Sequence, residues 1–222
     1  MDTKNIPKWL KRYIDETGLN KIKQSVAKAE TQTSGEIVPM VVLSSSTTGH
    51  VPVILFCCLW ISYFLFEGHH LMELLFGMHY TPYFDLTLMI PFALISTALG
   101  AVPFIQRSLV SPEDRQLQVD QRSQVEFYQA KLNETDGSSG ILIFISMMEH
   151  RVVVLADKAI SAKLPPETWD GLVNTTLGSL RNKDLATGLC QAIEICGNLL
   201  TPHLPIQADD KNELQDHLII KE

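Results

Sequence analysis

The sequence lacks charged residues over two long stretches. Residues 44–66 and 86–106 contain no Lys, Arg, Asp or Glu, although the chain as a whole carries 18 basic and 25 acidic side chains. About 20 uncharged, mostly apolar residues are enough, as a helix, to cross the roughly 30 Å hydrocarbon core of a bilayer. The two stretches therefore predict a pair of transmembrane helices, joined by an external loop at 67–85.

The sequence also lacks the short motifs that mark common catalytic sites. It contains no phosphate-binding Walker loop and no dinucleotide-binding fingerprint. Ser138-Ser139-Gly140 precedes a strand-like run rather than a helix, so it is not a nucleophile elbow. The four cysteines have neither disulfide-framework nor zinc-finger spacing. The net charge of −7 gives no general attraction for nucleic acid, which is therefore not an expected partner.

Positive charges are distributed unevenly around the predicted hairpin. Lys and Arg are plentiful before it and occur again after it, whereas the 67–85 loop contains neither. The positive-inside rule then places both flanks and both termini in the cytoplasm. The first residues have no signal-peptide core, so the internal segments are expected to carry the targeting information. The alternative is that both stretches are core helices of a soluble protein.

The segment before the hairpin has the periodicities of an α/β domain. EIVPMVVL, from Glu36 to Leu43, predicts a strand, and an amphipathic helix with apolar residues from Leu19 to Thr33 precedes it. Pro39 has no N–H to donate, so it must lie where no neighbouring strand needs one. Earlier still, five apolar residues share one helical face, which lies either on the inner leaflet or on its own domain. They are Ile6, Trp9, Leu10, Tyr13 and Ile14.

After the hairpin the pattern continues with a helix and two strands. Ser111-Pro112-Glu113-Asp114 is typical of a helix start, with Ser as the cap. ILIFISMM at 141–148 is a continuous apolar run, typical of a strand buried on both faces. RVVVLA at 151–156 can pair with it as a hairpin. The apolar stripe of the helix is expected to consist of Leu117, Val125, Tyr128 and Leu132.

Two more amphipathic helices, near Trp169 and after Leu185, complete the pattern. This order of elements predicts a three-layer α/β/α sandwich with a mixed sheet. Each half alone has too little sheet to bury its apolar strands, so strands from both sides of the hairpin are expected to pair. The predicted cytoplasmic domain therefore consists of residues 1–43 and 107–205. The acidic tail, 206–222, is expected to be mobile.

Five sequence blocks resemble one family. They are AETQTSGEIVPMVV, GILIFISMMEHRVVVLADKAI, the helix around Trp169, LLTPHLP and DDKNELQD, and their order and spacing are similar to those of the TPM domain family. The chain looks most like the membrane-inserted bacterial branch, whose members carry a hydrophobic hairpin after the first strand. The resemblance implies an α/β/α sandwich in the bacterial inner membrane. Relatives are associated with acid phosphatase activity, photosystem repair and receptor accessory function, so the family is functionally mixed.

Asp157 is the main candidate for a cytoplasmic metal site. It follows the RVVVLA strand, at a position where open α/β sheets place ligand-binding loops. The resemblance implies a divalent-ion site, for calcium or magnesium, near strand ends, and Asp157 is the best match to it. Glu36, Glu113 or Asp114 could complete the site, because hard cations need several oxygen ligands. The alternative is that Asp157 ends its strand or caps the next turn.

The external loop offers a second candidate metal site. His69 and Glu73 are four residues apart and would share a helical face, which suits zinc or copper. The alternative is an interfacial helix whose apolar residues dip into the bilayer while the histidines lie at the headgroups.

Three functions follow from these patterns. The first is a membrane-anchored TPM-like domain that serves as an accessory or regulatory partner of other membrane proteins, with the lipid bilayer itself as a partner. The second is a divalent-metal-dependent, phosphatase-like hydrolase, which the family resemblance alone implies. The third is metal binding by the histidine-rich external loop.

Overall fold

A computed structural model describes residues 6–46, 49–66, 70, 73–75, 77, 82–135, 139–206, 212–214 and 216–222. The chain forms two compact units. One unit consists of residues 1–45 and 116–222, and the other of residues 46–115.

A four-stranded mixed sheet lies at the centre of the first unit. Its strands are β1 (Glu36–Val42), β2 (Gly140–Ser146), β3 (Arg151–Ala156) and β4 (Ile219–Lys221), in the order β3-β2-β1-β4. β1 is parallel to both β2 and β4, whereas β2 and β3 form an antiparallel hairpin. Strands from before and after residues 46–115 therefore do pair in one mixed sheet, as the sequence predicts.

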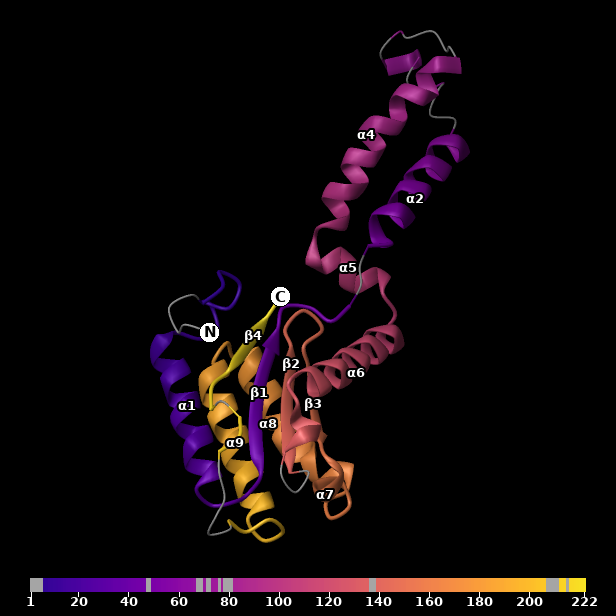
Figure 1. The fold of residues 1–222 in the computed structure, drawn as a ribbon. Coiled ribbons are helices and arrows are strands. Elements are labelled where there is room, and N and C mark those ends of the chain that lie inside the picture. The colour runs from indigo at the N-terminus through magenta and orange to yellow at the C-terminus, as the bar shows by residue number, and fades with distance from the viewer. Residues whose placement is uncertain are drawn as a thin grey trace. The chain divides into compact units, whose positions relative to one another are not determined.

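Helices cover both faces of this sheet (Figure 1). One face packs against α1 (Glu16–Glu30), α8 (Asp170–Arg181) and α9 (Leu185–Leu200). The other face packs against α6 (Pro112–Gln129) and the 3-10 turn η1 (Leu132–Glu134). The short elements α7 (Lys158–Ser161) and η3 (Pro166–Trp169) connect β3 to α8. The predicted three layers are thus present.

The two central strands are buried along their whole length because each face has its own helical layer. Ile37 and Val41 point into the core with α1 and α9, whereas Val38 and Met40 point into the core with α6. Pro39 faces the β4 side, and the pairing of β4 with β1 begins only at Met40. No residue of β4 pairs with Pro39, so the sheet loses no hydrogen bond because proline has no N–H.

Part of the acidic tail is ordered, contrary to the expectation of a mobile segment. Ile219–Lys221 forms β4, and the amide of Leu43 donates to the carbonyl of Lys221 at 3.3 Å. Leu218 joins the core with α1 and α9. A leucine and two adjacent isoleucines follow the acidic stretch. Burial of these three apolar side chains stabilises the segment by more than the acidic charges before it cost.

The apolar stripe predicted for α6 is wrong. Leu117, Val125 and Tyr128 are exposed, and the side of α6 that packs on the sheet presents Val119 and Phe127 instead. Only Leu132, which lies beyond the helix in η1, is buried as expected. The helix start at Ser111 is confirmed, because the amide of Asp114 donates to Ser111 Oγ at 3.0 Å.

The apolar residues near the start of the chain pack on their own domain. Residues 8–13 form turns rather than an α-helix. Leu10 and Ile14 are buried in the core with α1 and α9, and Tyr13 accepts a hydrogen bond from the amide of Leu185 through its carbonyl. Of the two alternatives for this segment, the structure supports packing on the domain.

The second unit contains α2 (Val51–Leu65), α4 (Pro82–Gly100) and α5 (Pro103–Leu109). Rings of α2 and α4 contact each other, with Trp60 and Tyr63 edge-on to Phe92. Pro91 lies inside α4, and Pro103 begins α5 instead of kinking a longer helix. In the part of the chain that the structure describes, no helix has both the length and the apolar character required of a membrane span.

Candidate functional site

Asp157 caps a helix. It follows β3 and is the N-cap of α7, where its Oδ1 accepts a hydrogen bond from the amide of Lys158 at 2.7 Å. The side chain is 7 % exposed, and Oδ2 is buried without a hydrogen-bond partner. The capping alternative for this residue is therefore what the structure shows. The second carboxylate oxygen is the one feature that capping does not explain.

Glu36 and Asp157 lie at the same end of the sheet, with one strand between them. Glu36 pairs with Gly140, and the amide of Asp157 donates to the carbonyl of Gly140 at 2.9 Å. By strand alternation both carboxylates project towards the α6 layer. The backbone of Leu132 lies against Gly140 on that same face. The segment at Leu132 therefore occupies the space above the strand that separates the two candidates.

The other predicted ligands lie in other elements. Asp114 accepts a hydrogen bond from Ser111 Oγ in the first turn of α6, which also contains Glu113. Glu73 lies in a helical segment and is exposed, and its predicted partner His69 is outside the described residues. Within the described ranges, no three His, Cys, Asp or Glu side chains converge as a metal site. These residues do not fit a calcium or magnesium ion, which needs several oxygen ligands.

A cluster of acidic residues, of which the sequence singled out only Glu36, lies beside the first residues of β1. Glu30, the last residue of α1, accepts a hydrogen bond from the amide of Ile37 at 3.0 Å. Glu36 accepts one from the amide of Glu213 at 3.2 Å. The pKa of Glu30 is raised to about 8, mainly by burial. The hydrogen bond from the Ile37 amide lowers this pKa, and the nearby charges of Glu36 and Asp216 raise it. Glu30 is therefore protonated at neutral pH.

A second polar cluster lies at the carboxyl ends of β1 and β2. Glu149 is buried, and its carboxylate accepts hydrogen bonds from Ser44 Oγ at 3.0 Å, the Ser45 amide at 3.2 Å and Ser146 Oγ. The hydroxyls of Ser45 and Ser146 are 2.7 Å apart. Carboxyl ends of parallel strands are where open α/β sheets bind ligands. Here the serines and the glutamate bind one another, so the cluster fixes the chain as it leaves β1.

Charged residues of α6 extend this cluster to the end of the chain. Arg122 donates to the carbonyls of Ser44 and Glu222. Glu126 is buried and forms ion pairs with Arg122 and with Lys221 of β4. The residues that leave β1 and the strand that ends the chain are therefore held by the same helix. No sequence motif marks this network, because its members are far apart in the chain.

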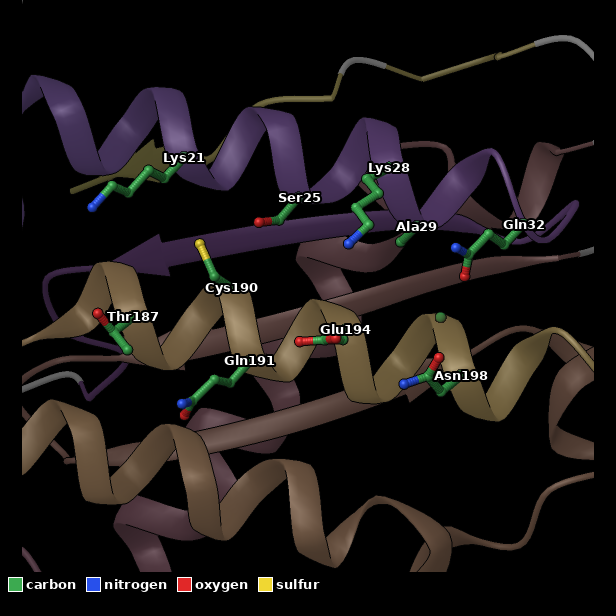
Figure 2. A pocket seen from close by; sticks show the side chains of 11 residues that line it. Lys21, Ser25, Lys28, Ala29, Gln32, Thr187, Cys190, Gln191, Glu194 and Asn198 are labelled. Atoms are coloured by element: carbon green, nitrogen blue, oxygen red, sulfur yellow. The ribbon is translucent and has the colours of Figure 1, made fainter.

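A polar groove of about 270 Å³ runs between α1 and α9 (Figure 2). Lys21 and Lys28 line it from α1, and Glu194 and Asn198 line it from α9. The carboxylate opposite the two lysines offsets their attraction for an anion. One carboxylate opposite two ammonium groups leaves a small positive excess among these lining residues.

Comparison with known proteins agrees with this fold. Residues 103–198 match the family model described as the TPM domain. The NMR structure of the BA42 protein from the psychrophilic bacterium Bizionia argentinensis is similar, with a TM-score of 0.57 and 17 % sequence identity over 94 % of this chain and 95 % of that chain. At this identity the likeness concerns the fold alone. No curated protein matches the chain. The segment 103–198, which includes α6, β2, β3, α8 and α9, is therefore similar to the TPM domain.

Proposed function

We propose that this protein is a membrane-anchored TPM-domain protein of the bacterial inner membrane. In this proposal α2 and α4 form the anchor, both termini are cytoplasmic, and the α/β/α sandwich is an accessory or regulatory partner of other membrane proteins.

The main support for the membrane anchor is the apolar outer surface of α2 and α4. Apolar side chains point outwards from both helices and are at least 58 % exposed. Large exposed apolar patches are rare on monomers in water and mark contact with lipid or protein. The residues are Val53, Ile61, Leu65 and Phe66 on the α2 side, and Leu86, Ile90 and Leu94 on α4.

The contact between the two helices also suits a hairpin in lipid. An added Cβ at Gly100 would lie 2.7 Å from Pro52 Cγ, so the glycine permits close approach of α4 to α2. Thr97 Oγ1 donates to the carbonyl of Ala93 at 2.9 Å, which satisfies a polar group within its own helix. The 15 residues of α2 rise about 22 Å and the 19 of α4 about 28 Å. A full crossing by α2 therefore requires its flanking residues or a thinner bilayer.

The accessory role rests on tethering. The chain leaves β1 at Ser44 and Ser45, which Glu149 and Arg122 hold. A domain held in this way on a membrane anchor meets other proteins of that bilayer at a high effective concentration. Weak contacts are then sufficient for a regulatory partner.

Flotation of the full chain with liposomes tests the anchor. Ile61→Lys places a charge on the outer face of α2, at a residue 58 % exposed, and should reduce the bilayer-bound fraction. Ile206→Lys is the matched control, because Ile206 is 52 % exposed in the sandwich unit, and it should float like the parent protein. Equal flotation of the two variants, or no flotation of the parent, would contradict the anchor.

Crosslinking in intact membranes, followed by purification in mild detergent, tests the accessory role. The full chain should enrich specific membrane proteins, and a variant with Ile61→Lys should lose them together with its membrane location. A parent protein that enriches no membrane protein would count against this role even if the anchor holds.

The two other predicted functions have less support. Asp157 Oδ2, buried without a partner, favours a divalent-metal-dependent phosphatase-like activity, but the surrounding residues do not supply further ligands. Hydrolysis of a generic phosphoester by the full chain, abolished by Asp157→Ala, would support that activity. Binding of zinc or copper through His69 and Glu73 of the loop remains a prediction, which titration of the full chain with either metal can test.

A further inference from the structure

The outward face of α6 carries no charge over three turns. Leu117, Val125 and Tyr128 are 56 %, 53 % and 64 % exposed on this face. Gln121 and Gln124, also exposed, lie between them. We call these five residues the α6 stripe.

The α6 stripe differs from the usual surface of a covering helix. A helix that packs on a core through one side normally presents charged residues on the other. The inner side of α6 is already in use, because Val119 and Phe127 pack against the sheet. The helix therefore has two apolar sides, and the second side is exposed in the part of the chain that the structure describes.

The residues of the α6 stripe are arranged so that two copies of the stripe can complement each other. Along the helix it runs from Leu117 through Gln121 and Gln124 to Tyr128. If two such helices cross antiparallel about a point between the glutamines, Leu117 of each faces Tyr128 of the other. Each Gln121 then faces Gln124, and side-chain amides can both donate and accept. We propose that the α6 stripe binds a second copy of this chain and forms a symmetric antiparallel dimer.

The charges at the two ends of the stripe favour the antiparallel direction. Helical periodicity puts Asp114 on the side of Leu117, one turn earlier, and Lys131 follows the last turn. An antiparallel pair brings Asp114 of one copy to Lys131 of the other, whereas a parallel pair would bring like charges together. Lys131 has an ion pair with Glu134 in its own chain, but both side chains are exposed, and such pairs contribute little.

The ring of Tyr128 is already positioned for such a contact. It meets Phe127 edge-on, with ring centroids 5.8 Å apart. A partly fixed aromatic side chain loses less conformational entropy on binding, and tyrosine is enriched among the residues that contribute most to binding. The proposal of a dimer does not rest on the proposed membrane anchor, since the five residues of the α6 stripe belong to the sandwich unit.

Disulfide crosslinking of the full chain tests the pairing and its direction. In a background with Cys57→Ser, Cys58→Ser and Cys190→Ser, a mixture of Leu117→Cys chains and Tyr128→Cys chains should crosslink under mild oxidation. Each variant alone should not, because identical positions lie apart in an antiparallel pair and a disulfide needs Cα atoms within about 7 Å. Crosslinking of Leu117→Cys with itself would indicate a parallel pair and would overturn the proposal.

Sedimentation equilibrium of the full chain in detergent gives an independent measurement. Val125→Glu should weaken dimerisation at least about tenfold, because it puts two like charges into one small interface. Ile206→Glu, at a residue of matching exposure outside the stripe, should leave it unchanged. A monomeric parent protein, or a dimer equally stable in both variants, would show that the stripe serves another macromolecule or none.

Discussion

The carbonyl oxygen of Leu132 lies over Gly140, so close that a Cβ on Gly140 would come within 2.3 Å of it. The contact joins η1 to the first residue of β2, between the positions of Glu36 and Asp157. A backbone atom cannot move aside as a side chain can. Packing therefore requires glycine at position 140. Gly140 also allows the backbone of Leu132 to lie between Glu36 and Asp157.

Gly140→Ala should lower the free energy of unfolding by about 3 kcal/mol, because the new methyl group overlaps the backbone of Leu132. Chemical denaturation measures this. Gly178→Ala is the control: it lies within α8 with no atom near the added Cβ, and it should raise stability by up to about 1 kcal/mol. Similar effects of the two substitutions would contradict the observed contact.

Glu30→Gln should change the pH dependence of stability. Burial raises the pKa of Glu30 from 4.5 to about 8 in the folded protein, so the folded state holds a proton that the unfolded state has released between these values. This group therefore makes stability fall as pH rises from about 4.5 to about 8. Glutamine can still accept the hydrogen bond from the Ile37 amide, and it does not titrate, so this pH dependence is removed. Near pH 8 the variant should have a free energy of unfolding higher than that of the parent by on the order of 1 kcal/mol, since partial exposure of Glu30 limits the effect.

Denaturation curves from pH 4.5 to pH 9 check this difference. Glu16→Gln, at the exposed first residue of the same helix, should leave the slope unchanged. If the Glu30 variant and the parent have parallel pH profiles, the carboxyl of Glu30 is ionised in the folded protein.

Glu149→Ala should be among the most damaging single changes in the sandwich. It removes the acceptor of the Ser44 and Ser146 hydroxyls and of the Ser45 amide, and buried donors without partners cost about 1–3 kcal/mol each. We expect a loss of roughly 3 kcal/mol in the free energy of unfolding. Hydrogen exchange at the Ser45 amide should also speed up. Glu167→Ala, at an exposed residue, is the control and should leave both measurements unchanged.

Asp157 distinguishes capping from metal binding. If it only caps α7, Asp157→Ala should cost about 1 kcal/mol and Asp157→Asn less, since asparagine is also a good cap. Neither variant should alter the effect of calcium or magnesium on the melting temperature. A calcium-dependent rise in the melting temperature of the parent that Asp157→Asn removes would show that the carboxylate binds the ion.

The central strands could be predicted from the sequence because burial on both faces requires apolar residues at nearly every position. EIVPMVV and ILIFIS are continuous apolar runs of strand length, and such runs are typical of strands covered on both faces. The same reasoning required the two to be neighbours, since neither could bury its faces alone. The register of Glu36 with Gly140 needed the structure.

The edge of the sheet and the orientation of α6 could not be predicted. β4 has only three residues beside an acidic tail, too few for a periodic signal. In α6, apolar residues occupy two opposite sides, and the hydrophobic pattern alone does not indicate which side meets the sheet. Val119 and Phe127 do so, and Leu117 and Tyr128 do not.

The strand-end positions of the two acidic residues followed from the sequence, but their spatial arrangement did not. The sequence placed Asp157 and Glu36 at strand ends, and they do share one end and one face of the sheet. That Leu132 separates them depends on a backbone contact that no composition or spacing indicates. The Glu149 network was missed because Ser44 and Ser45 lie about a hundred residues before Ser146 and Glu149 in the chain.

The pairing of β1 with β2 has a consequence for biosynthesis. A ribosome makes β1 early, yet its first parallel neighbour emerges only after the whole of residues 46–115 has been synthesised. Until then β1 is a nascent apolar segment with both edges open, a state prone to aggregation. Correct production of this chain should accordingly depend on the speed of translation through that insert and on chaperones that shield the waiting strand.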